Sequence, residues 1–236
     1  MSYRCRIDRL LVVSYLGLMG AGCGGAPPLP PVMPVGGAPV APADARAWVD
    51  SLRVQAPVTY KLKWLYRDRQ QSAGGRGSAR MVAGDSLRFD FAGPLGAGRG
   101  AAFVIGDSLQ WVQGEEGLQK LVPSYPLLWA IMGLPRLPAF TEVTRVQDPT
   151  LVAWRFVNGS DTVEYARIVG PPMKLVVDVR RADGRLGRVE TVFGPDGVPK
   201  SSRLTVPRGP ARLDITYVSS SRPNGYPPEI WVRPPQ

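Results

Sequence analysis

Apolar and polar side chains alternate at every second position along much of this chain, and this alternation constrains the fold more than any other feature. Clear examples are Tyr60–Arg67 and Ser86–Phe91, and a period of two is typical of strands with one buried face. Between such segments lie Asn158-Gly159, Asp183-Gly184 and Asp196-Gly197, which are strong signals for hairpin turns. The pattern predicts about ten to twelve antiparallel strands that follow one another as hairpins.

Two segments depart from this alternation and predict helices. Asp44–Gln55 has apolar residues at helical spacing, with Asp44 as the N-cap, and ends before Pro57. Pro126–Gly133 encloses the apolar run Leu127, Leu128, Trp129, Ala130, Ile131 and Met132. A helix that is apolar on all sides must be buried, and the simplest place for it is inside, or across the mouth of, a strongly curved sheet.

The residues therefore predict a mainly β fold with helices (α+β), in which a single strongly curved antiparallel sheet wraps around a short apolar helix. A hydrophobic share of 44% suffices to bury a core. The 27 glycines and 25 prolines are too many turn-forming residues for a bundle of helices. No domain boundary interrupts residues 43–236, so we expect one folded domain there.

The chain offers no recognisable catalytic or metal-binding unit. It contains no histidine, and both cysteines lie within the first 23 residues, which excludes Ser-His-Asp and Cys-His catalysis and any imidazole-dependent zinc site. Gly-Asp-Ser-Leu occurs at 84–87 and at 106–109 and resembles the motif of a serine-esterase family. Without a histidine base, Ser86 and Ser108 are unactivated hydroxyls, and two successive β-turns explain the repeat better. We expect a protein that is not an enzyme and needs no cofactor.

The N-terminus has the pattern of a secretion signal. Arg4, Arg6 and Arg9 precede a short apolar run at 10–19, which is followed by Gly20-Ala21-Gly22-Cys23. The run is too short to span a bilayer and is typical of a signal peptide. Small residues before a cysteine resemble the lipobox of bacterial lipoproteins, which implies a signal peptide at 1–22 and acylation of Cys23. The alternative is an ordinary cleaved signal with an incidental cysteine.

A proline-rich segment follows, with seven prolines in residues 26–42. Prolines at this density prevent helix and sheet and favour an extended, semi-rigid spacer. We therefore expect residues 23–42 to be a lipidated cysteine with a tether. Gly24 follows the cysteine and no aspartate is present there, which in lipoproteins of this kind favours the outer membrane.

The net charge of +10 raises the question of an anionic partner. Removal of residues 1–22 would take away three arginines and one aspartate and leave +8. The basic residues are spread singly along the chain, which is typical of a solvated surface. With a secretion signal in front, nucleic acid is not an expected partner.

Residues 76–138 resemble the LolA/LolB superfamily of periplasmic lipoprotein carriers and receptors. The matching motifs are 84–96, with the sequence Gly-Asp-Ser-Leu-Arg-Phe-Asp-Phe-Ala-Gly-Pro-Leu-Gly, and 106–111, followed by the apolar helix that runs into Gly133-Leu134-Pro135. The resemblance implies an incomplete antiparallel barrel closed by a short apolar helix, with a concave apolar face that accepts acyl chains. It also implies that Leu95, on a loop between two strands, assists insertion into the membrane.

These expectations define a candidate site and its partners. The predicted cavity lining is Trp64, Phe89, Phe91, Phe103, Trp111, Leu128, Trp129, Ile131 and Met132. The expected ligands are lipid acyl chains or lipoproteins, delivered by a periplasmic carrier protein to a monomer that Cys23 anchors to the outer membrane, facing the periplasm. The alternative is a structural or interaction lipoprotein of the envelope with the same fold, whose cavity is filled by its own side chains.

Overall fold

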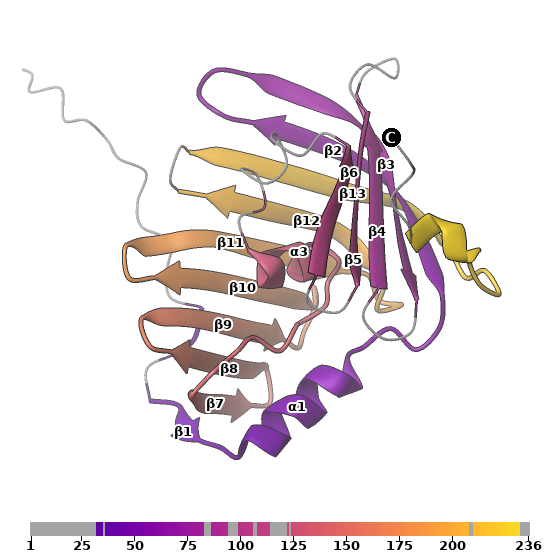
Figure 1. Cartoon of the computed structure of the whole chain (residues 1–236). Coiled ribbons are helices and arrows are strands. Elements are labelled where there is room, and N and C mark those ends of the chain that lie inside the picture. The colour runs from indigo at the N-terminus through magenta and orange to yellow at the C-terminus, as the bar shows by residue number, and fades with distance from the viewer. Residues whose placement is uncertain are drawn as a thin grey trace, which may run out of the picture. The chain divides into compact units, whose positions relative to one another are not determined.

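The computed structural model describes residues 32–34, 36–82, 86–93, 99–105, 108–113, 122, 124–207 and 210–231, and for 108–113 it describes the backbone alone. All of them belong to one compact unit, Pro31–Gln236. In these residues a single antiparallel sheet of thirteen strands dominates the fold (Figure 1). The prediction of one large antiparallel sheet is confirmed.

The strands follow one another as hairpins on either side of a single long-range junction. Their order is β1-β7-β8-β9-β10-β11-β12-β13-β2-β3-β4-β5-β6, so β13 and β2 join the late part of the chain to the early part. The bounds are β1 Ala38–Pro39, β2 Val58–Arg67, β3 Ser72–Val82, β4 Ser86–Ala92, β5 Arg99–Ile105, β6 Ser108–Gln113, β7 Glu142–Asp148, β8 Leu151–Asn158, β9 Asp161–Ile168, β10 Lys174–Arg181, β11 Gly184–Phe193, β12 Pro199–Val206 and β13 Ala211–Ser221. The three predicted hairpin dipeptides lie at the β8–β9, β10–β11 and β11–β12 turns.

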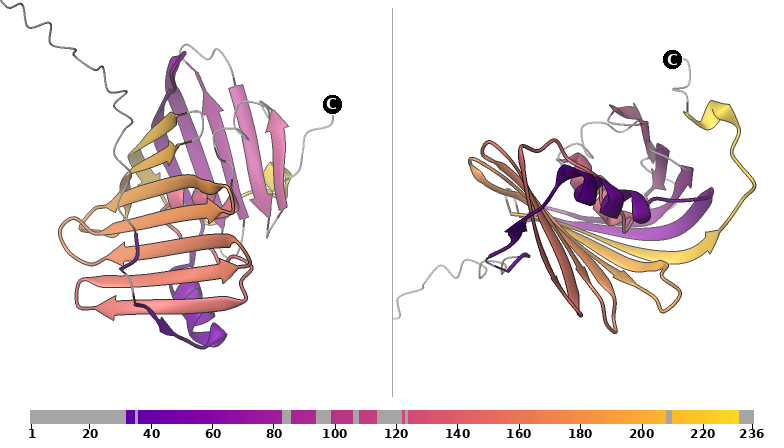
Figure 2. Two further views of the ribbon diagram at one scale, coloured as in Figure 1. Left: turned by 90° about the vertical axis from the view of Figure 1, so that its left-hand side faces the viewer. Right: turned by 90° about the horizontal axis from the view of Figure 1, so that it is seen from below.

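The sheet is bent and remains open. Its strand order ends at β1 on one side and at β6 on the other, and the view from below shows one concave and one convex face (Figure 2). The alternation predicted from the sequence turns apolar side chains to the concave face, where Trp154, Phe156 and Tyr165 are fully buried. The main core of the unit therefore lies on the concave side.

Helix α1 (Pro42–Ser51) begins earlier than predicted. Pro42 occupies the first turn and Ala41 is the N-cap, without a side-chain hydrogen bond, so the prediction of Asp44 as N-cap is wrong. Proline is favoured at this place because its missing N–H would have no partner there. Asp44 lies in the first turn, where its negative charge suits the helix dipole.

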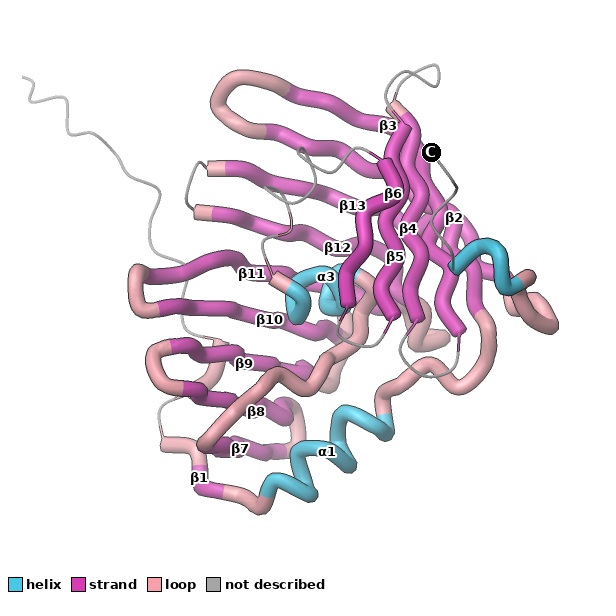
Figure 3. The backbone as a smooth tube through the Cα atoms, in the orientation of Figure 1, coloured by secondary structure: helices cyan, strands magenta, loops and turns pink. Residues whose placement is uncertain are grey.

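Helix α3 (Tyr125–Ile131) confirms the predicted buried helix. All six apolar residues from Leu127 to Met132 are buried, and the helix packs against β10, β11 and β12. Figures 2 and 3 show it on the concave side of the sheet. A short 3-10 helix, η2 (Pro228–Trp231), lies near the C-terminus.

The described part of the proline-rich segment differs from the extended spacer predicted for residues 26–42. Val32 and Met33 are buried against Ala153, Ala166 and Val176, and β1 pairs with β7. Proline does exclude a central strand, but an edge strand needs hydrogen bonds on one side alone. The compact unit therefore begins about twelve residues before the predicted boundary at 43.

Candidate binding site on the concave face

Three hydroxyl groups of the sheet hold the C-terminal end of α3. Thr191 Oγ1 donates a hydrogen bond to the carbonyl oxygen of Ala130 at 2.7 Å. Ser202 Oγ donates to the carbonyl oxygen of Ile131 at 2.7 Å, and the Tyr217 hydroxyl donates to that same oxygen. The last carbonyls of a helix have no partner within the helix, so these bonds satisfy them and attach α3 to β11, β12 and β13.

Two tyrosines, the buried Tyr165 and the partly buried Tyr217, contribute to this attachment. The Tyr165 hydroxyl donates to the carbonyl oxygen of Arg136 at 2.6 Å, which holds the chain that follows α3. Burial raises the pKa of Tyr165 and also that of Tyr217 above the ordinary value, because it removes water from around the phenolate. Both phenols therefore stay protonated and act as hydrogen-bond donors at neutral pH.

The opposite side of α3 makes apolar contacts and encloses a small cavity. Its volume is about 30 Å³, and all of its described lining residues are apolar: Leu87, Phe89, Ala102, Val104, Val122, Leu128, Ile131, Leu213 and Ile215. This volume is about the share of one water molecule in the liquid, whereas ligand pockets measure roughly 300–1,000 Å³. The cavity marks a loosely filled seam between α3 and β4, β5 and β13.

A row of aromatic rings continues from this cavity along the concave face. Phe89, which lines the cavity, lies 6.2 Å from Phe91 between ring centroids, and Phe91 lies 6.2 Å from Trp64 with perpendicular ring planes. All three side chains are only partly buried. A Cβ at Gly100 would overlap the Phe91 ring, so this glycine allows the ring to lie on β5. We call Trp64, Phe89 and Phe91 the aromatic row.

The structure divides the predicted lining residues into groups. Phe89, Leu128 and Ile131 line the cavity, and Trp64 and Phe91 complete the aromatic row. Trp129 and Met132 are buried in the core but are not among the described lining residues of the cavity, and the Trp129 ring lies 5.0 Å from the Arg136 guanidinium.

The prediction for Phe103 is wrong. The register pairs Phe103 with Arg88 and Val104 with Leu87, so Val104 shares the concave face with Leu87, and Phe103 lies on the convex face. The alternation of Ala101, Phe103 and Ile105 predicts an inward Phe103, but β5 is apolar and buried at consecutive positions, so its pattern does not distinguish the two faces. Leu213 and Ile215 line the cavity but were not named as site residues, although their place in an alternating segment was a signal for this position.

Three predicted site residues fall outside what can be described. Trp111 pairs with Ala102 in the backbone register, but its side chain is outside the described part of the chain, as are Cys23 and Leu95. In the described residues, no helix is long and apolar enough to cross a membrane. The same residues contain no group of three or more Asp, Glu, His or Cys side chains that could hold a metal ion.

The described residues thus define an open antiparallel β fold with an apolar site between its concave face and a buried helix. No protein-family model and no curated protein sequence matches the chain. Solved structures with a similar fold include a candidate outer membrane lipoprotein-sorting protein domain from Vibrio parahaemolyticus, at 7% identity and a TM-score of 0.47, covering 80% of this chain and 94% of that one.

Two further similar structures come from other bacteria. A LolA superfamily protein from Nitrosomonas europaea has 9% identity and a TM-score of 0.47, covering 82% of this chain and 98% of that one. A DUF1329 family protein from Desulfovibrio piger has 9% identity and a TM-score of 0.38, covering 80% and 95%.

Proposed function

We propose that the concave face binds apolar chains, such as the acyl chains of lipids or lipoproteins, between α3 and the aromatic row. The observation that carries this proposal is the continuity of an apolar cavity with partly exposed aromatic rings. Burial of a hydrocarbon chain contributes about 0.8 kcal/mol per CH₂ and needs no polar group. An apolar lining without catalytic side chains suits this task.

Binding requires the site to open, because a cavity of about 30 Å³ cannot hold an acyl chain. Hydrogen bonds attach α3 to β11–β13, whereas Leu128 and Ile131 only share the lining of the apolar cavity with residues of β4 and β5. When α3 separates from β4 and β5, a hydrocarbon chain can take the place of the lost apolar contacts, so neither surface has to be exposed to water. In this proposal α3 closes the incomplete barrel and stays with β11–β13, and the ligand enters between α3 and β4–β5.

The wider proposal places this site at the bacterial outer membrane. Acylation of Cys23 would anchor the domain there, facing the periplasm, and Leu95 would assist insertion of a lipoprotein that a periplasmic carrier delivers. The signal-like N-terminus and the sequence motifs at 84–96 and 106–111 support this LolB-like role.

A titration with a fluorescent fatty acid tests the binding site. We expect saturation at about one chain per protein, and at least a tenfold loss of affinity for Phe91→Glu, because an unpaired carboxylate is strongly disfavoured in apolar surroundings. Val218→Glu is the matched control, since Val218 is an apolar residue that is already 59% exposed. A folded protein without saturable binding would contradict the proposal.

A membrane-fractionation experiment tests the anchor. We expect Cys23→Ser to release the protein from membranes, and the intact mass of the membrane-extracted protein to show a diacylglycerol and a fatty acid on a chain that begins at Cys23. Cys5→Ser is the control, because Cys5 lies in the segment that cleavage would remove. Retention of the Cys23→Ser variant in membranes would count against the anchor.

One observation favours a second candidate function. The cavity is nearly filled by the protein's own side chains, which suits a structural or interaction lipoprotein without a ligand. The fatty-acid titration separates the two functions, because a filled core gives no saturable binding.

A further inference from the structure

Opposite charges face each other across the strands on much of the convex face. Arg155 and Glu164 are directly opposite on β8 and β9 and lie 2.7 Å apart. Arg203 and Asp214 are directly opposite on β12 and β13 and lie 2.9 Å apart. Cross-strand pairs of opposite charge stabilise a sheet, whereas like charges directly opposite destabilise it.

Strands β2 and β3 break this pattern. Lys63 lies directly opposite Arg76, and Lys61 and Arg67 lie on the same face of β2, two and four residues away. All four side chains are exposed, and in the described part of the chain none of them forms an ion pair. We call Lys61, Lys63, Arg67 and Arg76 the basic patch.

The cross-strand neighbours of the basic patch do not neutralise it. Lys61 lies between Ser219 and Ser78, and Lys63 lies between Thr216 and Arg76. The partners of Arg67 are Arg212 and Ser72, and the further partner of Arg76 is Ala92. The residues directly opposite the basic patch are therefore serine, threonine, alanine or other basic residues, and none of them is acidic.

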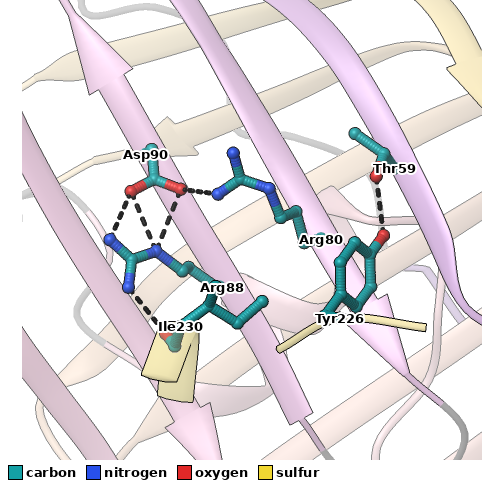
Figure 4. A network of polar contacts seen from close by, with 6 residues as sticks. All are labelled: Thr59, Arg80, Arg88, Asp90, Tyr226 and Ile230. Carbon is teal, nitrogen blue, oxygen red and sulfur yellow. Dashed lines mark hydrogen bonds and ion pairs between the residues drawn. The ribbon is translucent and has the colours of Figure 1, made fainter. Parts of the chain in front are cut away.

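The nearby carboxylates already bind other groups. Asp90 forms ion pairs with Arg80 at 2.7 Å and with Arg88 at 2.9 Å, and Arg88 also donates to the carbonyl oxygen of Ile230 in the C-terminal segment (Figure 4). Asp214 binds Arg203 and Arg212. The basic patch therefore keeps a surplus of positive charge, in a place where that charge destabilises the sheet.

We propose that the basic patch docks this protein onto an anionic phospholipid surface. The patch lies on an exposed strand face, which matches an extended surface of headgroups, and basic side chains near such a surface are attracted to it. The aromatic side chains of β2, Tyr60, Trp64 and Tyr66, lie on the other face, so no ring of β2 lies among the basic side chains for a nucleic-acid base to stack on. The ring beside the patch, Tyr226, already binds Thr59 and packs edge-on against Trp231. The inference goes beyond the acyl-binding site and does not depend on it.

A vesicle partition experiment tests this inference. It uses the full chain with Cys23→Ser, so that acylation does not contribute, and phosphatidylcholine vesicles with or without about one third phosphatidylglycerol. The patch variant carries Lys61→Gln, Lys63→Gln and Arg76→Gln. The control variant carries Arg46→Gln, Arg181→Gln and Lys200→Gln, which removes three exposed charges elsewhere.

We expect the patch variant to lose its preference for anionic vesicles by on the order of 100-fold at low salt, which corresponds to about fivefold per basic residue. The control variant should keep nearly all of the preference, since its charges lie away from the patch. Equal losses in the two variants would show that net charge alone matters and would overturn the inference. Binding of an oligonucleotide through the same residues at lower phosphate concentration than the vesicles would overturn it as well.

The Lys63→Glu variant distinguishes an effect on vesicle binding from an effect on the stability of the fold. It replaces the like-charge pair with an ion pair to Arg76, so the urea midpoint should rise while the preference for anionic vesicles falls at least about fivefold. A variant that is destabilised, or that keeps the full preference, would contradict the inference.

Discussion

The two ends of the sheet carry the same kinds of side chain but bury them differently. On β8 and β9, Trp154 and Tyr165 are 1% and 0% exposed. On β2 and β4, Trp64 and Phe91 face the same concave side and are only partly buried. The alternation is equally regular in both regions, so the difference arises from what lies on top of each.

Helices cover the region of β8–β12, whereas glycines leave the region of β2–β4 with fewer side chains. Trp48 of α1 stacks on Trp154 with ring centroids 5.4 Å apart, and α3 packs on β10–β12. In contrast, β3 has Gly75 opposite Trp64 and Gly77 opposite Phe91 on the concave face, so the rings of β2 and β4 have little side-chain surface beside them. Strands β7–β12 therefore form a covered scaffold, whereas the region around β2–β5 keeps partly exposed apolar surface.

The largest expected effect on stability comes from a Phe→Ala substitution, made once in each region. Phe156→Ala should lower the free energy of unfolding by about 3–5 kcal/mol, because Phe156 is fully buried. Phe91→Ala should cost less than about 2 kcal/mol, since part of the ring is already in water. Urea denaturation of the two variants measures the difference. Equal losses would contradict the division into a scaffold and an open region.

A smaller effect is expected from Gly75→Ala. The added Cβ would overlap the backbone carbonyl oxygen of Ala92, so β3 and β4 would have to separate, at a cost of about 1–3 kcal/mol. Amide hydrogen exchange should accelerate in β3 and β4 and stay unchanged in β8 and β9. Gly225→Ala is the control, because no atom lies within 4 Å of a Cβ at that position.

Removal of one hydroxyl group from the scaffold should lower the free energy of unfolding by less than Gly75→Ala does. Thr191→Val removes a hydrogen bond to the Ala130 carbonyl, which still accepts one from the Gly133 N–H, so we expect a loss of about 0.5–1.5 kcal/mol in urea denaturation. Thr216→Val, at an exposed position, should stay within about ±0.5 kcal/mol. If both variants behave alike, the hydroxyls do not hold α3.

The smallest expected effect concerns Tyr66 at the tip of β2. A hydrogen bond to Asp68 and partial burial raise the Tyr66 pKa to about 12. Because this pKa lies above its unfolded value, the contribution of Tyr66 to stability is complete below pH of about 10 and is lost as the pH rises through about 12. Asp68→Asn should bring the pKa back toward about 10 in an ultraviolet titration. An unchanged titration would show that Asp68 is not the cause.

Local patterns predict most of the strands, and the exceptions have physical reasons. The alternation and the turn dipeptides indicate β2, β4–β6 and β8–β13. Strand β3 has no such pattern, because glycines occupy several of its positions, and β7 buries only Val143. The pairing of β13 with β2 has no local signal, since the two strands lie far apart in the sequence and pair through the shape of the whole sheet.

The candidate site is only partly predictable for similar reasons. The buried helix follows from the apolar run, and the aromatic row follows from the alternation in β2 and β4. The hydroxyls of Thr191, Ser202 and Tyr217 lie at inward positions of alternating segments, and a hydroxyl there indicates a buried partner. The identity of that partner, the end of α3, depends on the fold and could not be found from the sequence.

The first strand affects how neighbouring copies of the protein meet. Strand β1 is two residues long, is exposed, and ends in Pro39, which has no N–H to offer a further strand. A sheet edge of this kind is a poor template for pairing with another molecule. Copies that the proposed anchor concentrates on one membrane would therefore be protected at this edge against edge-to-edge aggregation.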